Sequence, residues 1–108
     1  PTFSAIYADP NGDSASAYQI NVNSNSSFTG TSLWDSGKVT TTILDEHRSS
    51  EYQYNGTELN NSHNIYYWRI KFWDSDDTPS DWSATAQFTD TFSSFRFGGI
   101  GLEGLKLD

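Results

Sequence analysis

The stretch that decides the fold is Ile65-Tyr-Tyr-Trp-Arg-Ile-Lys-Phe-Trp-Asp74. Two series of side chains alternate along it: one consists of Tyr66, Trp68, Ile70 and Phe72, and the other of Tyr67, Arg69, Lys71 and Trp73. A period of two is typical of a β-strand, because successive side chains point to opposite faces of a sheet. The pattern therefore predicts a strand with one buried face and one amphipathic face. A buried face this aromatic needs a second layer to cover it, which favours a β-sandwich.

The composition also indicates a single all-β domain. The chain has 108 residues, which is long enough for one hydrophobic core and too short for two. Hydrophobic residues make up 34% and aromatic residues 16%, so a few large rings must supply most of the burial. Ser and Thr account for 27 residues, and Ser/Thr-rich sequence broken by glycines is typical of short strands and turns.

Charge and residue usage exclude several classes of function. The net charge of −8 argues against nucleic-acid partners, which need clustered Lys and Arg, and the same charge would be repelled by anionic membranes. No apolar run is long enough to insert into a membrane, and the absence of cysteine excludes zinc fingers, thiol catalysis and a disulfide scaffold. Because the chain begins at Pro1, we expect a processed product or a piece of a longer protein.

Periodicity and turn residues divide the chain into strands and a core. Strands are expected at about residues 2–8, 17–23, 32–35, 52–54, 65–74 and 82–89, with residues 38–42 pairing back after the turn at Ser36-Gly37. The residues expected to be mostly buried are Tyr18, Ile20, Val22, Trp34, Tyr66, Trp68, Ile70, Phe72 and Phe88. Together these elements form a sandwich domain over residues 1–89.

Residues 90–108 differ in character from this domain. Large apolar residues are spread through them with four glycines, and the apolar set is Phe92, Phe95, Phe97, Ile100, Leu102, Leu105 and Leu107. A segment this apolar does not stay bare in water. We therefore expect it to pack on this domain, on a neighbouring copy or on a following domain, either as a donor strand or as the start of that domain.

The order of elements resembles a fibronectin type III domain, an immunoglobulin-like sandwich, of the kind found in microbial surface proteins and glycan-active enzymes. The residues that carry the resemblance are 17–22, 33–37, 54–59, 66–74 and Trp82-Ser83. The resemblance implies that Tyr66 is the corner tyrosine and that Leu59 plugs the preceding loop. It also implies that strand A is missing, since nothing precedes residue 2 to form it. An exposed sheet edge would then be open to strand addition by residues 92–107. We expect that segment to reach a neighbour, with Gly98 and Gly99 as the hinge.

The acidic loops are a candidate calcium site. In the expected fold, loops 9–13 and 74–81 lie at one end of the sandwich, and their oxygen donors are Asp9, Asn11, Asp13, Asp74, Asp76 and Asp77. Calcium binds six to eight oxygens of this kind. The alternative is that Asp is simply a good turn residue, since no complete calcium-loop spacing is present. No other cofactor is expected.

The outer face of strand 65–74 is a candidate cation–π ladder. Its members are Tyr67, Arg69, Lys71 and Trp73, together with Trp82 from the next strand. Cations placed between rings are the expected partners for stacking. A face of exposed rings with polar neighbours is the alternative, and it would suit a carbohydrate ligand.

The remaining motifs are weak. Asn25, Asn55 and Asn60 each open an N-x-Ser/Thr sequon in a predicted turn, so they are glycosylation candidates. Gly99-Ile-Gly-Leu-Glu-Gly104 matches a dinucleotide-binding fingerprint, but too few residues follow it for the helix and strand that such a site requires. No motif marks a nucleophile, so we expect no catalytic residues.

Two functions from different classes are compatible with these observations. The first is a non-catalytic extracellular structural or adhesive module at the cell surface, which could be the repeating subunit of a filament assembled by strand addition, with self-association or neighbouring domains as partners. The alternative is a carbohydrate- or ligand-binding accessory module of a larger secreted enzyme. An enzyme that uses the acidic loops is a weaker third interpretation.

Overall fold

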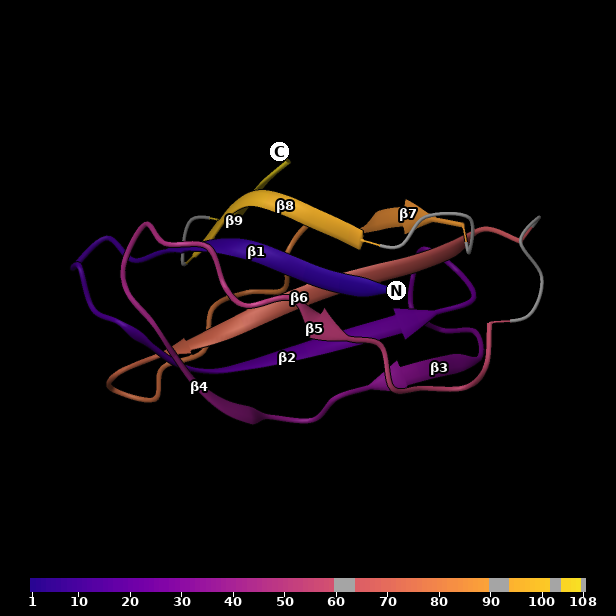
Figure 1. The fold of residues 1–108 in the computed structure, drawn as a ribbon, viewed down its shortest axis with the longest axis horizontal. Coiled ribbons are helices and arrows are strands. Elements are labelled where there is room, and N and C mark those ends of the chain that lie inside the picture. Colours follow the sequence, from indigo (N-terminus) through magenta and orange to yellow (C-terminus); the bar gives the residue numbers. More distant parts are fainter. Residues whose placement is uncertain (60–63, 90–93, 102–103, 108) are drawn as a thin grey trace.

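The computed structural model describes residues 1–59 and 64–89, and the backbone of residues 94–101 and 104–107. The described chain is all-β and forms two sheets (Figure 1). Its strands are β1 (Thr2–Ala8), β2 (Ala15–Asn23), β3 (Ser32–Asp35), β4 (Val39–Ile43), β5 (Tyr52–Gln53), β6 (Tyr66–Asp74), β7 (Ala86–Phe88), β8 (Ser94–Gly101) and β9 (Gly104–Leu107). The predicted immunoglobulin-like sandwich is confirmed. No helix in the described ranges is long and apolar enough to span a membrane.

The aromatic strand β6 lies at the centre of the first sheet. The strand order in that sheet is β3-β2-β6-β7, and β4 pairs with β2 as well. Burial alternates along all nine residues of β6, so the two faces assigned from the sequence are correct. The antiparallel register places Trp68 opposite Val22 and Ile70 opposite Ile20, which joins two apolar rows on one face.

The second sheet has the order β5-β1-β8-β9. One edge of β1 pairs with β5, and its other edge runs parallel to β8 from Thr2 to Ala8 (Figure 1). β8 continues into an antiparallel pair with β9, in which Gly101 lies opposite Gly104. Gly99, Gly101 and Gly104 of the glycine-rich motif therefore lie in two paired strands, and no helix begins at the described part of the motif.

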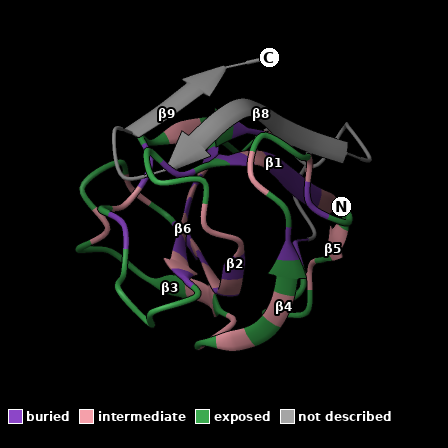
Figure 2. Ribbon diagram, turned by 90° about the vertical axis from the view of Figure 1, so that its left-hand side faces the viewer, coloured by how far each residue is buried: buried purple, intermediate pink, exposed green. Residues whose placement is uncertain are grey.

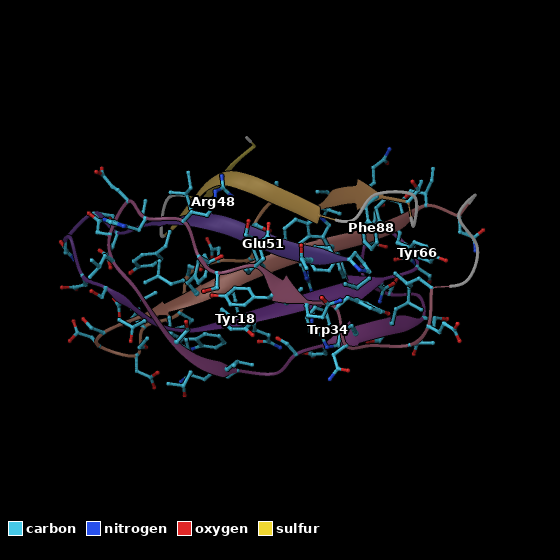
Figure 3. All side chains as sticks on the ribbon, viewed as in Figure 1. Tyr18, Trp34, Arg48, Glu51, Tyr66 and Phe88 are labelled. Atoms are coloured by element: carbon cyan, nitrogen blue, oxygen red, sulfur yellow. The ribbon has the colours of Figure 1, made fainter. Side chains whose placement is uncertain are left out.

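The core lies between the two sheets, where buried residues of both layers face one another (Figure 2). Phe3 of β1 supplies a central ring, which lies 4.6 Å from the Trp68 ring and 5.5 Å from the Phe88 ring between centroids. The Tyr66 and Phe88 rings pack at 5.6 Å, and both are labelled in Figure 3. Leu59 is also buried in this cluster, as the resemblance implied.

Seven of the nine predicted core residues are buried, and two are not. The buried ones are Ile20, Val22, Tyr66, Trp68, Ile70, Phe72 and Phe88. Tyr18 and Trp34 are only partly buried and pack against the cluster from its margin. Tyr18 stacks on Tyr52 of the opposite sheet at 3.7 Å, and Trp34 lies on β3, an edge strand. Residues near the edges of the two layers keep one side open to solvent.

The predicted last strand, residues 82–89, is shorter than expected because serine side chains replace part of the ladder. Ser83 donates its backbone N–H to the Ile70 carbonyl, and its hydroxyl accepts the Ile70 N–H at 2.9 Å. The same hydroxyl donates to the carbonyl of Ala84, the next residue along the chain. Ser80 repeats all three bonds with Phe72 and Asp81. We call this arrangement a serine clasp.

Two further serine clasps hold other strands. Ser36 binds both backbone groups of Ile20 on β2, and Ser49 binds both backbone groups of Ala5 on β1. In each case the hydroxyl again donates to the carbonyl of the following residue. A clasp satisfies the N–H and C=O of a buried strand residue without a regular partner strand. It therefore closes strand edges in short, irregular segments.

The apolar C-terminal segment occupies the place where strand A would lie. β8 runs beside the outer edge of β1 in the same chain, so the expectation that it would reach a neighbouring copy is not what the structure has. Gly98 and Gly99 do not form a hinge, because both lie inside β8. The register shifts there, since Ala5 faces Phe97 and Tyr7 faces Ile100, which is a β-bulge. Phe92 and Leu102 lie outside the described residues.

Candidate functional site

The outer face of β6 carries an alternating series of cations and rings. The Arg69 guanidinium lies 4.1 Å from the centroid of the Phe28 ring and 4.3 Å from that of Trp82. The Lys71 ammonium lies 4.7 Å from the Trp82 centroid and 5.0 Å from that of Trp73. We call this series the ladder; its members are Phe28, Arg69, Trp82, Lys71, Trp73 and Lys38, whose ammonium lies 4.9 Å from the Trp73 centroid.

Polar groups at the margins of the ladder hold the cations in position. The Arg69 side chain donates to Oδ1 of Asn21 on the neighbouring strand, at 3.2 Å from its closer nitrogen. Lys38 forms an ion pair with Asp77. Burial acts to raise the pKa of Asp35, but hydrogen bonds from Gln19, Gly37 and Asn21 and the charge of Lys71 lower it overall. Asp35 is therefore an ionised carboxylate at the edge of this face, where its charge is opposite to that of Lys71.

The predicted cation–π face is only partly the observed one. Arg69, Lys71, Trp73 and Trp82 are in the ladder, but among the described residues no cation lies over the ring of Tyr67. Phe28 and Lys38 belong to it and were not predicted. Both come from loops, and Phe28 has a positive φ of 60°, so no strand periodicity points to either of them.

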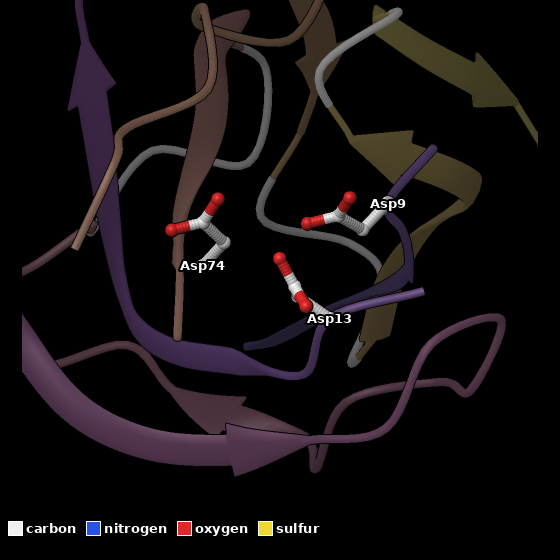
Figure 4. Close-up of side chains that lie close together, drawn as sticks. All are labelled: Asp9, Asp13 and Asp74. Atoms are coloured by element: carbon white, nitrogen blue, oxygen red, sulfur yellow. The ribbon is translucent and has the colours of Figure 1, made fainter. Parts of the chain in front are cut away.

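A second cluster lies where β1 ends, β2 begins and β6 ends. Carboxylate oxygens of Asp9, Asp13 and Asp74 lie within 4.8 Å of one another (Figure 4). Asp9 is 6% exposed and Asp74 is 7% exposed, whereas Asp13 is half-buried. The two acidic loops therefore meet at one end of the sandwich, as expected.

Backbone amides orient two of these carboxylates. Asp9 accepts hydrogen bonds from the Tyr7 hydroxyl at 3.0 Å and from the Asn11 N–H at 2.8 Å. Asp74 accepts bonds from the N–H groups of Asp76 and Thr78, each at 2.9 Å. Negative charges lie close together here, and the pKa values of Asp13 and Tyr7 are raised as a result.

Asp13 and Tyr7 both become harder to ionise in this cluster. Desolvation and the negative charges of Asp9, Asp76 and Asp74 raise the pKa of Asp13. Burial raises the pKa of Tyr7 above its usual value, and the hydrogen bond from its hydroxyl to Asp9 acts in the same direction. Both shifts follow from negative charge concentrated in a partly desolvated place.

Three of the predicted calcium ligands converge, and three act differently. Asn11 and Asp76 contribute backbone N–H groups to the cluster, and Asp77 binds Lys38. The cluster supplies carboxylate oxygens of the kind that calcium binds. Calcium binding stays a prediction.

The sequons differ in how free their side chains are. Asn25 is engaged in its own loop, where its Oδ1 accepts from the N–H of Thr29 and its Nδ2 donates to the hydroxyl of the same residue. Asn55 is exposed, and Asn60 lies outside the described residues. Glycosylation at these positions stays a prediction.

Comparisons with known proteins give the chain a family context. Residues 1–92 match the model of the Rha78A-like, N-terminal immunoglobulin domain. An α-L-rhamnosidase from Formosa agariphila (strain DSM 15362 / KCTC 12365 / LMG 23005 / KMM 3901 / M-2Alg 35-1) is 36% identical over 92 residues, which is 82% of this chain and 9% of that protein. An α-L-rhamnosidase from Alteromonas sp. (strain LOR) is 34% identical over 73 residues, which is 66% of this chain and 7% of that protein.

Solved structures show the same relationship. The α-L-rhamnosidase of Streptomyces avermitilis, solved in complex with L-rhamnose, superimposes with a TM-score of 0.57 at 32% identity, over 72% of this chain and 7% of that one. The α-L-rhamnosidase of Dictyoglumus thermophilum gives a TM-score of 0.53 at 29% identity, over 72% of this chain and 8% of that one. This chain spans less than a tenth of the length of each relative. It belongs to the family of Rha78A-like, N-terminal immunoglobulin domains.

Proposed function

We propose that this chain is a non-catalytic accessory module of a larger α-L-rhamnosidase, and that its role is structural support of the parent enzyme. The family and the small share of each relative that the chain covers favour an accessory module over a filament subunit. Of the functions considered from the sequence, the family therefore supports the alternative, an accessory domain of a glycan-active enzyme. Its extracellular location stays a prediction.

The ladder is the observation that favours support over sugar binding. A sugar that stacks on a protein needs an open aromatic face. The rings of Phe28, Trp73 and Trp82 each have at least one cation within 5.0 Å of the centroid. A sugar that stacks on the ring face covered by a cation would have to displace that cation. The ladder fits a role in holding the sheet together.

Carbohydrate binding is the second candidate, and one observation favours it. Tyr67 is half-exposed on the same face of β6, and among the described residues no cation covers its ring. A sugar could stack there with Arg69 or Lys71 as a polar neighbour. The two candidates differ in whether the isolated module binds rhamnose.

Two measurements separate the candidates. The first is titration of this chain with L-rhamnose, followed through the indole and amide signals in NMR spectra, where structural support predicts no shifts. The second compares the parent enzyme with a version that lacks residues 1–92, where structural support predicts a lower melting temperature. Rhamnose-dependent shifts at Tyr67 or Trp73 would favour the carbohydrate-binding function. A deletion that leaves stability and activity unchanged would overturn the proposal of structural support.

A further inference from the structure

The outer edge of β1 is the starting point of a further inference. Its inner edge is occupied by residues 46–53: the Ala5 N–H donates to the Ser49 hydroxyl and the Tyr7 N–H donates to the His47 carbonyl. Backbone N–H groups alternate sides along a strand. The N–H groups of Ser4 and Ala8 therefore point to the opposite edge, where β8 lies.

The outer edge is a binding edge for a strand, as its register shows. Thr2 to Ala5 face Ser94 to Phe97 one to one, and the pairing resumes at Tyr7 and Ala8 after the bulge. In a parallel ladder, the backbone groups of one residue bond to the two residues that flank its partner. Because Ser4 faces Arg96, its N–H and C=O are directed at Phe95 and Phe97.

Burial of Ser4 is consistent with a covered edge. Ser4 lies on the face of β1 opposite the core residues Phe3 and Ala5, yet it is only 2% exposed. Its hydroxyl accepts a hydrogen bond from Arg48 at 3.1 Å. A side chain on the outer face of a strand is open to water unless other parts of the chain cover it, so this face of β1 is covered at Ser4.

The strand that occupies this edge comes from beyond the immunoglobulin domain. The family match ends at residue 92, and β8 begins at Ser94. β7 ends at Phe88, so residues 89–93 are all that separates the last strand of the sandwich from β8. Five residues span too short a distance to carry Ser94 far from the end of β7.

We propose that the outer edge of β1 is a docking edge for the segment that directly follows the immunoglobulin domain in the same polypeptide. Residues 94–101 extend the sheet across the domain boundary, and β9 extends it by a further strand. A continuous sheet then joins the module to the next part of the polypeptide and fixes their relative orientation. That this next part belongs to a rhamnosidase rests on the proposed function, whereas the docking itself does not.

Native-state hydrogen exchange of the full 108-residue chain tests the docking edge. The Ser4 and Ala8 amides should be protected in the same way as the Ala5 and Tyr7 amides, which serve as internal controls on the other edge of β1. Exchange of Ser4 and Ala8 at the rate of free amides, with Ala5 and Tyr7 still protected, would overturn the proposal. The proposed function would survive that result, because its own test is made on the parent enzyme.

A matched pair of variants tests the occupant of the edge. Phe97→Ala and Phe97→Pro both remove the ring, but only the proline removes the N–H directed at the Ser4 carbonyl. The proline variant should raise the Ser4 exchange rate about tenfold more than the alanine variant does, while Ala5 and Tyr7 change little. Equal Ser4 rates in the two variants would contradict docking by β8. If the proline variant loses protection at every amide, the measurement on the unmodified chain decides.

Discussion

Trp68 of β6 and Trp82 from the loop that follows β6 lie on opposite faces of this strand and are held by different interactions. Trp68 is 2% exposed and packs on Phe3 and the other rings between the sheets. Trp82 is half-buried and contacts two cations on the outer face. The inner face is stabilised by removal of apolar surface from water, and the outer face by cation–π contacts that remain partly hydrated. The inner face of β6 therefore belongs to the hydrophobic core, and its outer face is held by weaker cation–π contacts.

The largest effect is expected on the inner face. Trp68→Ala should lower the free energy of unfolding by about 3–5 kcal/mol, because it removes a buried ring and leaves a cavity in a small core. Urea denaturation followed by circular dichroism measures this loss. Trp68→Phe, which keeps a ring in place, should cost clearly less. A loss no larger than that of an exposed side chain would mean that the face of β6 towards the core is wrongly assigned.

The edge of β6 should show an intermediate effect. Ser83→Ala removes the hydroxyl that accepts the N–H of Ile70, a residue with 0% exposure. The donor left unsatisfied should reduce the free energy of unfolding by about 1–3 kcal/mol. Ser75→Ala, at an exposed loop position, is the matched control and should be nearly neutral. Equal stability of the two variants would show that the serine clasp contributes nothing.

The outer face should show a smaller, pairwise effect. A double-mutant cycle of Arg69→Gln and Trp82→Leu should give a coupling energy of about 0.5–1 kcal/mol, since their side chains contact each other at 4.3 Å. A second cycle with Tyr67→Leu in place of the tryptophan change should give no coupling, because the Tyr67 ring shares this face without a cation over it. Coupling of similar size in both cycles would refute the ladder as a set of specific contacts.

Periodicity explains which parts of the fold and the site could be predicted. β6 follows a strict period of two, and tertiary packing respects it because a shift by one residue would expose the whole row. On β2 the alternation is interrupted, which is why Tyr18 is only partly buried although Ile20 and Val22 are in the core. The ladder residues on β6 follow from the same alternation. Phe28 and Lys38 do not, since they reach the ladder from loops whose path is set by three-dimensional closure.

The serine clasps and the position of the C-terminal segment could not be predicted for a different reason. A serine beside a strand has no periodic signature, and only the geometry reveals that Ser80 and Ser83 stand in for ladder partners. The missing strand A did indicate an open edge, but nothing in the sequence says whether the strand that fills it runs in the same chain. The convergence of Asp9 and Asp74 was predictable, because Asp9 follows β1, Asp74 is the last residue of β6, and both strands end at the same end of the sandwich.

Calcium addition tests the acidic cluster at the C-terminal end of β6. If the cluster of Asp9, Asp13 and Asp74 binds calcium in the folded state, the ion should raise the melting temperature relative to chelator. The gain is about 0.4 kcal/mol at a calcium concentration equal to Kd, and it grows with the logarithm of concentration above that. Identical melting curves in calcium and in chelator would show that the cluster is an acidic turn without a metal.

The smallest effect is expected from the charge of Asp13 in the absence of calcium. Its pKa is raised by desolvation and by the charges of Asp9, Asp76 and Asp74, so its ionised form is less favourable in the folded state than in the unfolded chain. Asp13→Asn should therefore raise the melting temperature at neutral pH in chelator. The benefit should shrink as the pH falls through the raised pKa and vanish below the unfolded value, because Asp13 is then neutral in both states. Asp81→Asn, which removes the same charge from an exposed acid outside the cluster, is the matched control, and its effect on the melting temperature at neutral pH should be smaller. A lower melting temperature for Asp13→Asn would mean that this carboxylate stabilises the loop, contrary to the crowding of charge at the end of β6.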